Sequence, residues 1–338
     1  MLQVIASRFI LRCFKLLIFF TTFILFGCNK EVTFSKGVIS DLSNEQLLSA
    51  QFSKQGNLLL ILKLSGQATV FNANNFNVEF EVPKSEELQQ TRLALLSGDG
   101  SKLILANDND VAIWSVSGKA LIGKTQFMGV QQFAKISALA ISDDNDKLIV
   151  GMSDGAINMA TLSTRLNNRF KPHTRPVTHI SFLDNEKYWS ASQDGKLAYR
   201  VFASAEPITE QEFAHRITSL VLGHDNNKMF VSDALKTQLV KPLTGQGAAI
   251  QLQYMARFMV FRQAYFINHA DLLATSSSKN HLSLWDTQTG EELGTWQSQV
   301  ETPTATILSM FSNDKGELLT INSDAMLEKW DLTQLNTL

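Results

Sequence analysis

His173-Thr-Arg-Pro-Val-Thr-His-Ile-Ser-Phe182, followed by the turn Leu183-Asp-Asn-Glu186, opens the stretch of sequence that decides the fold. The stretch continues as Lys187-Tyr-Trp-Ser-Ala-Ser192, the turn Gln193-Asp-Gly195 and Lys196-Leu-Ala-Tyr-Arg-Val201. The runs are short and rich in β-branched and aromatic residues, and the turns between them carry Asp, Asn or Gly. This order is typical of consecutive antiparallel strands joined by tight turns.

The same order of strand and turn recurs along the chain. Segments that align with the third run end at positions 71, 114, 160, 200, 240, 285 and 330, so their spacings are 43, 46, 40, 40, 45 and 45 residues. A period of about 40 to 45 residues is typical of one four-stranded blade in a radial array. The repeats therefore predict an all-β fold, a single seven-bladed β-propeller over residues 32–338.

The last repeat ends too soon to contain a fourth strand of its own, because Leu338 follows Trp330 by only a few residues. The stretch Glu31-Val-Thr-Phe-Ser-Lys-Gly-Val-Ile39 lies before the first full repeat and alternates apolar with polar residues. We expect this N-terminal strand to complete the last blade from outside. Such closure covers an edge that would otherwise be unpaired.

Two signature dipeptides, Trp285-Asp286 and Trp330-Asp331, end the third strands of the last two repeats, and Trp114-Ser115 is a half match. An aspartate recurs in the turn before the third strand, at Asp108, Asp154, Asp194, Asp233 and Asp324. With these features the chain resembles the WD-repeat (tryptophan-aspartate repeat) family of β-propellers over roughly residues 32–338.

The resemblance implies a structural role for the residues that carry it. In that family a buried Trp, a Ser or Thr, a His and an Asp form a hydrogen-bond network within one blade. The fourth repeat keeps His173, Ser190 and Asp194 but has Arg200 in place of the tryptophan. The residues expected to hold blades together are Trp114, His173, Asp194, Trp285, Asp286, Trp330 and Asp331.

The amino terminus has the pattern of an export signal. Three basic residues precede an apolar run of 11 residues at 16–26, followed by Gly27 and Cys28. That run is shorter than the roughly 20 apolar residues that span a bilayer. Leu25-Phe26-Gly27-Cys28 resembles the bacterial lipobox, although Phe26 is larger than the residue usual there.

The lipobox resemblance implies a signal peptide at 1–27, cleavage before a lipid-modified Cys28, and a short linker at 28–31. The alternative is an uncleaved signal anchor with a chance cysteine. Asn29 stands where an inner-membrane retention signal would have aspartate. By resemblance, this favours a lipid-anchored protein on the periplasmic side of the outer membrane.

Charge and motif content exclude several classes of function. Removal of residues 1–27 leaves 27 basic and 32 acidic side chains, a net charge of −5, which disfavours nucleic-acid binding. The six histidines show no paired metal-ligand spacing, and no CxxC pair or phosphate-binding glycine loop is present. We therefore expect no catalytic residue, metal or cofactor. The alternative is a propeller enzyme, a metal- or quinone-dependent hydrolase or oxidoreductase with its site in the central channel.

Three connecting segments, 126–135, 165–175 and 254–262, carry the aromatic, Met and basic residues that are enriched at protein interfaces. Some of these residues are expected in outer strands or the core, Phe261 among them. We expect a monomeric, non-catalytic scaffold that binds a protein partner through the face formed by the connections between blades. The residues predicted to bind it are Arg165, Arg169, Lys171, Arg175, Tyr254, Arg257 and Phe258.

Overall fold

The computed structural model describes residues 36–84, 88–223, 227–244, 247–254, 260–267, 271–278, 280–313 and 315–332. The predicted signal peptide, the predicted lipid-attachment residue Cys28, and the predicted binding residues Arg257 and Phe258 lie outside these ranges.

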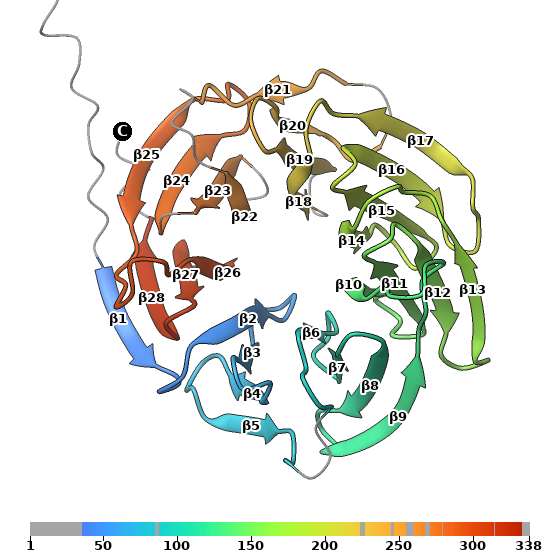
Figure 1. Ribbon diagram of the computed structural model, residues 1–338. Coiled ribbons are helices and arrows are strands. Elements are labelled where there is room, and N and C mark those ends of the chain that lie inside the picture. Colours follow the sequence, from blue (N-terminus) through green and yellow to red (C-terminus); the bar gives the residue numbers. More distant parts are fainter. Residues whose placement is uncertain are drawn as a thin grey trace, which may run out of the picture. The chain divides into compact units, whose positions relative to one another are not determined.

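Seven four-stranded antiparallel sheets make up the described chain, and each sheet is one blade of a ring (Figure 1). Blades 1 to 3 contain β2 (Leu47–Phe52), β3 (Leu58–Lys63), β4 (Ala68–Asn72), β5 (Val78–Glu81); β6 (Leu93–Leu96), β7 (Lys102–Ala106), β8 (Asp110–Ser115), β9 (Ala120–Gln126); and β10 (Ile136–Ile141), β11 (Lys147–Met152), β12 (Ile157–Thr161), β13 (Leu166–Phe170). Blades 4 and 5 contain β14 (Val177–Phe182), β15 (Lys187–Ser192), β16 (Lys196–Val201), β17 (Pro207–Glu212); and β18 (Ile217–Gly223), β19 (Lys228–Asp233), β20 (Gln238–Pro242), β21 (Ile250–Gln251). Blades 6 and 7 contain β22 (Phe261–Ile267), β23 (Leu272–Ser277), β24 (His281–Asp286), β25 (Glu292–Gln297); and β26 (Ile307–Ser312), β27 (Glu317–Asn322), β28 (Met326–Asp331), β1 (Lys36–Asp41).

The ring closes between the two ends of the described chain. β1 pairs antiparallel with β28, from Lys36 opposite Trp330 to Asp41 opposite Met326. It is therefore the outermost strand of blade 7, whose order is β1-β28-β27-β26. Of the predicted stretch 31–39, residues 36–39 belong to this strand, and residues 31–35 lie outside the described residues.

Burial changes from the inside of each blade to its outside. The second strands are apolar and covered on both sides: in β3, Leu59 through Leu62 are at most 1% exposed. The outermost strand β13 is polar and exposed along most of its length. The core lies between neighbouring blades, where Leu60 of blade 1 and Leu103 and Trp114 of blade 2 belong to one cluster.

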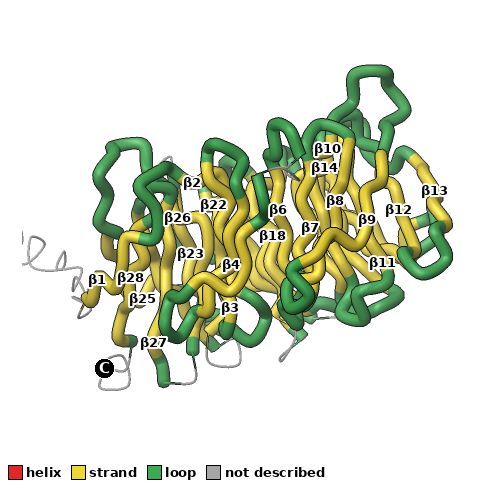
Figure 2. The backbone as a smooth tube through the Cα atoms, turned by 90° about the horizontal axis from the view of Figure 1, so that it is seen from below, coloured by secondary structure: helices red, strands yellow, loops and turns green. Residues whose placement is uncertain are grey.

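Loops gather at the two ends of the strands (Figure 2). We call one end the connection face: it holds the links from each outermost strand to the next innermost strand, and the turns between second and third strands. The opposite face holds the turns between first and second strands and those between third and outermost strands. Within the described residues, no helix is long and apolar enough to cross a membrane.

Candidate functional site

The side chains at the family's network positions come together in blade 4. His173 Nε2 lies 3.0 Å from Ser190 Oγ, and His173 Nδ1 lies 3.3 Å from Asp194 Oδ2. His173 and Ser190 are almost fully buried. Burial alone would raise the pKa of Asp194, but hydrogen bonds from His173 and from backbone amides hold this pKa well below its ordinary value. These contacts join the turn after β15 to the loop before β14.

Arg200 stands in the tryptophan position of that blade and is 2% exposed. Its guanidinium lies 5.6 Å from the ring centre of Phe170, in the neighbouring blade, and its Nη2 is 3.6 Å from a carboxylate oxygen of Glu210. Nη1 also donates to the carbonyl oxygen of Ala205. A buried, paired arginine thus replaces the indole within this part of the molecule.

Tryptophans occupy the corresponding position in three other blades. Trp285 Nε1 donates to Thr275 Oγ1 at 2.8 Å, and Trp330 Nε1 donates to Thr320 Oγ1 at 2.9 Å. Trp114 is equally buried, but its N–H has no hydrogen-bond partner among the described residues. Asp286 accepts bonds from backbone amides of the turn after β24, and Asp331 ends β28. The hydrogen bonds of Trp285 and Trp330 join neighbouring strands, and those of Asp286 hold a turn in place.

The turn aspartates fix the loops of the connection face. Asp154 Oδ2 accepts hydrogen bonds from the backbone amides of Val130 and Gln131, at 2.7 and 2.8 Å. Burial alone would raise the pKa of Asp154, yet its hydrogen bonds from backbone amides keep this pKa below the ordinary value. Asp324 binds the amides of Glu301 and Thr302 in the same way. Asp154 and Asp324 therefore bind the backbone of the loops beside them.

The loop at 127–135, between blades 2 and 3, presents apolar side chains to solvent. Phe133 is 85% exposed, Val130 58% and Met128 45%, whereas Phe127 at the start of the loop is buried. The loop is nevertheless anchored, since Asp154 binds its amides and the N–H of Lys135 donates to Ser153 Oγ. A fixed loop with an exposed phenylalanine loses little conformational freedom when a partner covers it.

The predicted basic residues separate into two groups. Lys171 and Arg175 are exposed on the loop 171–176, on the connection face. Arg169 lies in β13, and its Nη1 donates to the carbonyl oxygens of Met128 and Gly129 at 3.2 and 2.7 Å. Arg169 therefore supports the apolar loop from the neighbouring blade.

The prediction that Arg165 shares this face is wrong. Arg165 lies in the turn between β12 and β13, at the opposite end of β13 from Lys171. The sequence shows five basic or potentially basic residues within 11 positions, but an intervening β-strand carries the chain from one face to the other.

The prediction of Tyr254 as an exposed anchor is also corrected. Its ring is partly buried and meets the rings of Phe261 and Trp285, with centroid distances of 5.1 and 6.3 Å. It packs against the core cluster of blades 5 and 6. Phe261 is 3% exposed, as expected for a core residue.

The loop 127–135, between blades 2 and 3, and the loop 171–176, between blades 3 and 4, form one continuous surface. They meet across the turn 153–156, where the N–H of His173 donates to the carbonyl oxygen of Gly155 at 3.2 Å. Gly155 has a φ of +90°, and a Cβ there would lie 2.1 Å from the carbonyl oxygen of His173. Only glycine allows this close approach. We call the surface of residues 128–133 and 171–175 the docking surface.

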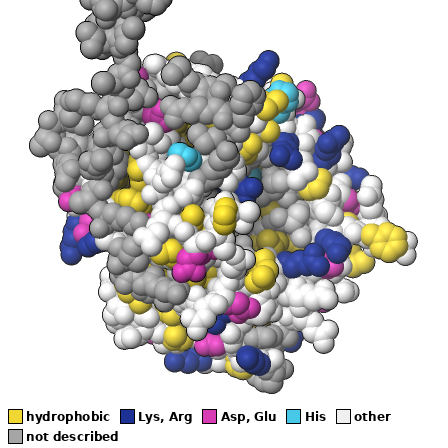
Figure 3. All heavy atoms as spheres, turned by 60° about the vertical axis from the view of Figure 1, so that its left-hand side comes forward, with side chains coloured by type: hydrophobic (Ala, Val, Ile, Leu, Met, Phe, Trp, Pro, Cys, Tyr) yellow, Lys and Arg dark blue, Asp and Glu magenta, His cyan; other side chains and the backbone are white. Residues whose placement is uncertain are grey.

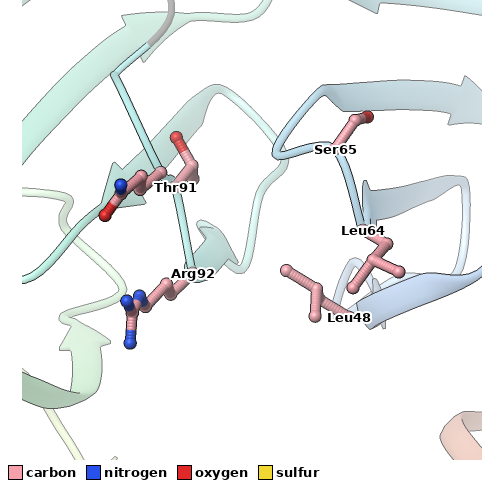
Figure 4. Close-up of a pocket in the computed structure, with 6 residues that line it drawn as sticks. Leu48, Leu64, Ser65, Thr91 and Arg92 are labelled. Carbon is pink, nitrogen blue, oxygen red and sulfur yellow. The ribbon is translucent and has the colours of Figure 1, made fainter.

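A pocket of about 520 Å³ lies on the connection face, between blade 1 and the loop before β6 (Figure 4). Leu48 and Leu64 line it from blade 1, and Thr91 and Arg92 line it from the loop before β6. Arg92 Nε lies 3.4 Å from Asp108 Oδ1, while Lys135 Nζ lies 2.7 Å from Asp108 Oδ2. These ion pairs connect the pocket to the last residue of the loop 127–135.

Charge differs between the two faces. On the connection face, exposed Lys and Arg side chains lie in loops and near the starts of strands. Several carboxylates on that face point inward and accept hydrogen bonds from backbone amides. These exposed cations include Lys84, Arg92, Lys135, Lys171, Arg175, Arg216, Lys236 and Arg262. The opposite face exposes acids in turns of blades 2 to 4, namely Asp99, Asp143, Asp144, Asp184 and Glu186. Figure 3 shows Lys and Arg side chains beside hydrophobic ones on one side of the molecule.

No group of three or more His, Cys, Asp or Glu side chains within the described ranges is arranged to hold a metal ion. Sequence reasoning selected the segment 126–135 but not Phe133 within it. The signal for Phe133 is its position outside any strand alternation, between Gln132 and Ala134. Leu48 and Leu64 carried no such signal, because both belong to or border apolar strands.

No protein-family model and no curated protein matches the chain. Many solved structures share its fold. One is the crystal structure of the β-propeller domain of Cps50 (Swd1) from Myceliophteria thermophila, with a TM-score of 0.72 and 12% sequence identity, covering 88% of this chain and 100% of that one. At this identity the likeness concerns the fold. The prediction of the fold is confirmed: the chain is an all-β, seven-bladed propeller similar to a WD40 propeller.

Proposed function

We propose that the protein is a non-catalytic interaction scaffold that binds a protein partner through the docking surface. The observation that carries the proposal is Phe133, which is 85% exposed on a loop held by partly buried hydrogen bonds to Asp154. Aromatic anchors surrounded by charged residues are typical of the centres of protein interfaces. Lys171 and Arg175 lie beside the apolar loop in a protein whose body is acidic, which favours an acidic partner surface.

The proposal includes a lipid anchor at Cys28 and a periplasmic location at the outer membrane, on the strength of the lipobox resemblance. Cys28 is eight residues before Lys36, a distance of at most about 29 Å along an extended chain. β1 begins at the opposite face, where its first residue pairs with Trp330 near the end of β28. A lipid at Cys28 would therefore tether the propeller through the first residue of β1, which lies at the face opposite the docking surface.

The test is in-membrane cross-linking of the full-length protein, followed by purification, with wild type compared with the double variant Val130→Ser/Phe133→Ser. Loss of two exposed apolar side chains should reduce a specific cross-linked partner by about tenfold or more. The fold should be unaffected, because both side chains point to solvent.

Leu235→Ser is the matched control, since Leu235 is 58% exposed on the same face but in blade 5. It should leave the cross-linked partner at the wild-type level. Equal loss in the control, or undiminished capture by the double variant, would refute the docking surface. Stoichiometric metal in the purified propeller would instead favour the enzyme alternative.

A further inference from the structure

A second cavity lies between the outer parts of blades 2 and 3, away from the docking surface. It has a volume of about 590 Å³, within the range of roughly 300 to 1,000 Å³ that is usual for ligand sites. Ile113, Phe127 and Ala160 are its buried apolar lining residues. Ile122 and Leu166, which are 57% and 66% exposed, also line it. We call this cavity the blade 2–3 groove.

Gly123 is the reason that the groove is open. It lies inside β9, pairs with Ile113, and a Cβ built on it meets nothing within 4 Å. Its φ lies outside the left-handed region, so no turn geometry demands a glycine there. Glycine weakens the interior of a strand and often marks a β-bulge or the close approach of a ligand or another backbone. Gly123 adjoins a register shift in β9, and the space beside it is empty.

Blade 1 shows what the same position does when it is filled. Phe80 of β5 pairs with Val70 just before the register shift, as Gly123 pairs with Ile113 before the equivalent shift in blade 2. Phe80 is 4% exposed, and its ring lies 5.8 Å from that of Trp114 in the next blade. An aromatic side chain thus closes the space between blades 1 and 2, and its counterpart between blades 2 and 3 is absent.

Cations outnumber acids in the lining of the groove: Lys102, Lys124 and Arg165 line it with Asp146, whose carboxylate binds Ser163. Arg165 lines it from the turn after β12, is exposed, and forms no ion pair with any described residue. Lys124 of β9 also lines the groove without an ion pair among the described residues. Arg165 has a φ of +59°, as Phe76 and Lys119 have positive φ in the equivalent turns of blades 1 and 2, so this conformation belongs to the turn. An unpaired arginine in this setting suits an anionic group on the occupant.

The free edge of β9 suits an extended occupant. β9 is the outermost strand of blade 2 and runs for seven residues, Ala120–Gln126. It contains no proline and only one charged residue, so its outward backbone groups are open to another strand. Addition of a strand to a sheet edge uses backbone hydrogen bonds for affinity and pockets for alternate side chains to provide specificity.

We propose that the blade 2–3 groove binds an extended acidic segment of a partner protein, which adds to the edge of β9. An apolar side chain of the segment enters the space above Gly123, and a carboxylate meets Arg165. The site is separate from the docking surface, because Arg165 and Phe133 lie at opposite faces of the propeller.

The probe is a fluorescent heptapeptide that alternates leucine with glutamate, carries a photo-cross-linker, and is compared with a leucine–lysine peptide of the same length. Fluorescence anisotropy with the full chain should show binding of the glutamate peptide, and cross-links should map to β9 and β13. The lysine peptide should bind at least about tenfold more weakly, since Arg165 and Lys124 would repel it.

Gly123→Phe should fill the groove as Phe80 does in blade 1, reduce binding of the glutamate peptide by at least about tenfold, and leave the thermal unfolding temperature unchanged or higher. Ile208→Phe adds a ring to β17, an exposed outermost strand of blade 4 away from the groove, and should bind the peptide like wild type. Arg165→Glu should reduce binding and weaken its salt dependence without filling any space.

Undiminished binding by a folded Gly123→Phe protein, or by Arg165→Glu, would overturn the proposal. So would peptide-independent dimerisation that Gly123→Phe abolishes, because the occupant would then be a second copy. Binding of decanoate in preference to the peptide would assign the groove to a small amphiphile. The Val130→Ser/Phe133→Ser protein should bind the peptide normally, which separates this test from that of the proposed function.

Discussion

Trp114, Trp285 and Trp330 have the same place in their blades but different hydrogen bonding. The two later tryptophans donate to a threonine on the adjacent second strand, whereas Leu105 occupies that position beside Trp114. An unsatisfied buried donor costs about 1 to 3 kcal/mol. Blade 2 tolerates this because Trp114 packs into a large apolar cluster.

Thr275→Val should therefore destabilise the protein by about 1 to 3 kcal/mol, because it leaves the N–H of Trp285 buried without an acceptor. Urea unfolding gives the measurement. In the double variant Thr275→Val/Trp285→Phe both polar partners are absent, so part of the loss should be recovered. Equal stability of wild type and Thr275→Val would show that this hydrogen bond contributes nothing.

The contacts of single residues could be predicted from the sequence where they depend on spacing within one blade. The separation of His173 from Ser190 and Asp194 follows from the strand-turn order of one blade, and the three do meet. Tyr254 was misjudged because its burial depends on Trp285, which belongs to a later strand. Periodicity within a segment carries no information about such a neighbour.

Among elements, the inner three strands of each blade and the N-terminal strand that closes blade 7 were predictable, whereas the outermost strand β13 was not. The third strands end within a residue or two of the aligned positions because burial on both faces gives them a strong apolar signal. β13 is exposed and polar, with the sequence Leu166-Asn-Asn-Arg-Phe170, and it therefore was taken for part of a connection. That error placed Arg165 on the wrong face.

The aspartates in the turns before the third strands should make the stability of the fold decrease at acid pH. Burial opposes ionisation of Asp154 and Asp324, but hydrogen bonds from backbone amides and, for Asp324, Thr302 lower both pKa values below the ordinary value. A carboxyl whose pKa is lower in the folded state stabilises that state above its unfolded pKa of about 3.9. This stabilisation is retained near neutral pH and is lost as the pH falls through the folded pKa.

Asp324→Asn should lower the urea midpoint at pH 7 and reduce the further drop seen between pH 5 and pH 3. Denaturation curves at a series of pH values measure both effects. Asp143→Asn, which removes an exposed ion pair with Lys54, is the control and should shift the midpoint less at pH 7. An unaltered acid drop in Asp324→Asn would contradict the role given to the turn carboxylates.

At the scale of the whole molecule, the repeat period predicted the number of blades, while the segregation of charge between faces was not foreseen. The period of the repeats depends only on positions along the sequence, so alignment of the repeats reveals it. Which face a charge occupies depends on whether its turn follows a first, second, third or fourth strand. Boundaries accurate to a few residues are needed for that assignment.

The lipid anchor is tested on the natively expressed protein. Intact mass should correspond to a chain that begins at Cys28 and carries acyl groups, and the protein should fractionate with membranes. Cys28→Ala should abolish the acylation and release the propeller into the soluble fraction with its unfolding midpoint unchanged. An intact segment 1–27, or an unmodified Cys28, would remove the anchor from the proposed function.

β1 gives the proposed tether a mechanical meaning. A partner held by the docking surface and a lipid held by the membrane would pull on the protein from opposite faces, and the tension would pass through β1. β1 runs antiparallel to β28 from Lys36 to Asp41, so a pull on its first residue acts along the strand axis. The hydrogen bonds between the strands then share the load in shear instead of opening one after another. Because β1 also closes the ring, a tension large enough to extract it would break the closure of blade 7. The strand that closes the propeller is therefore also the strand that carries the mechanical load.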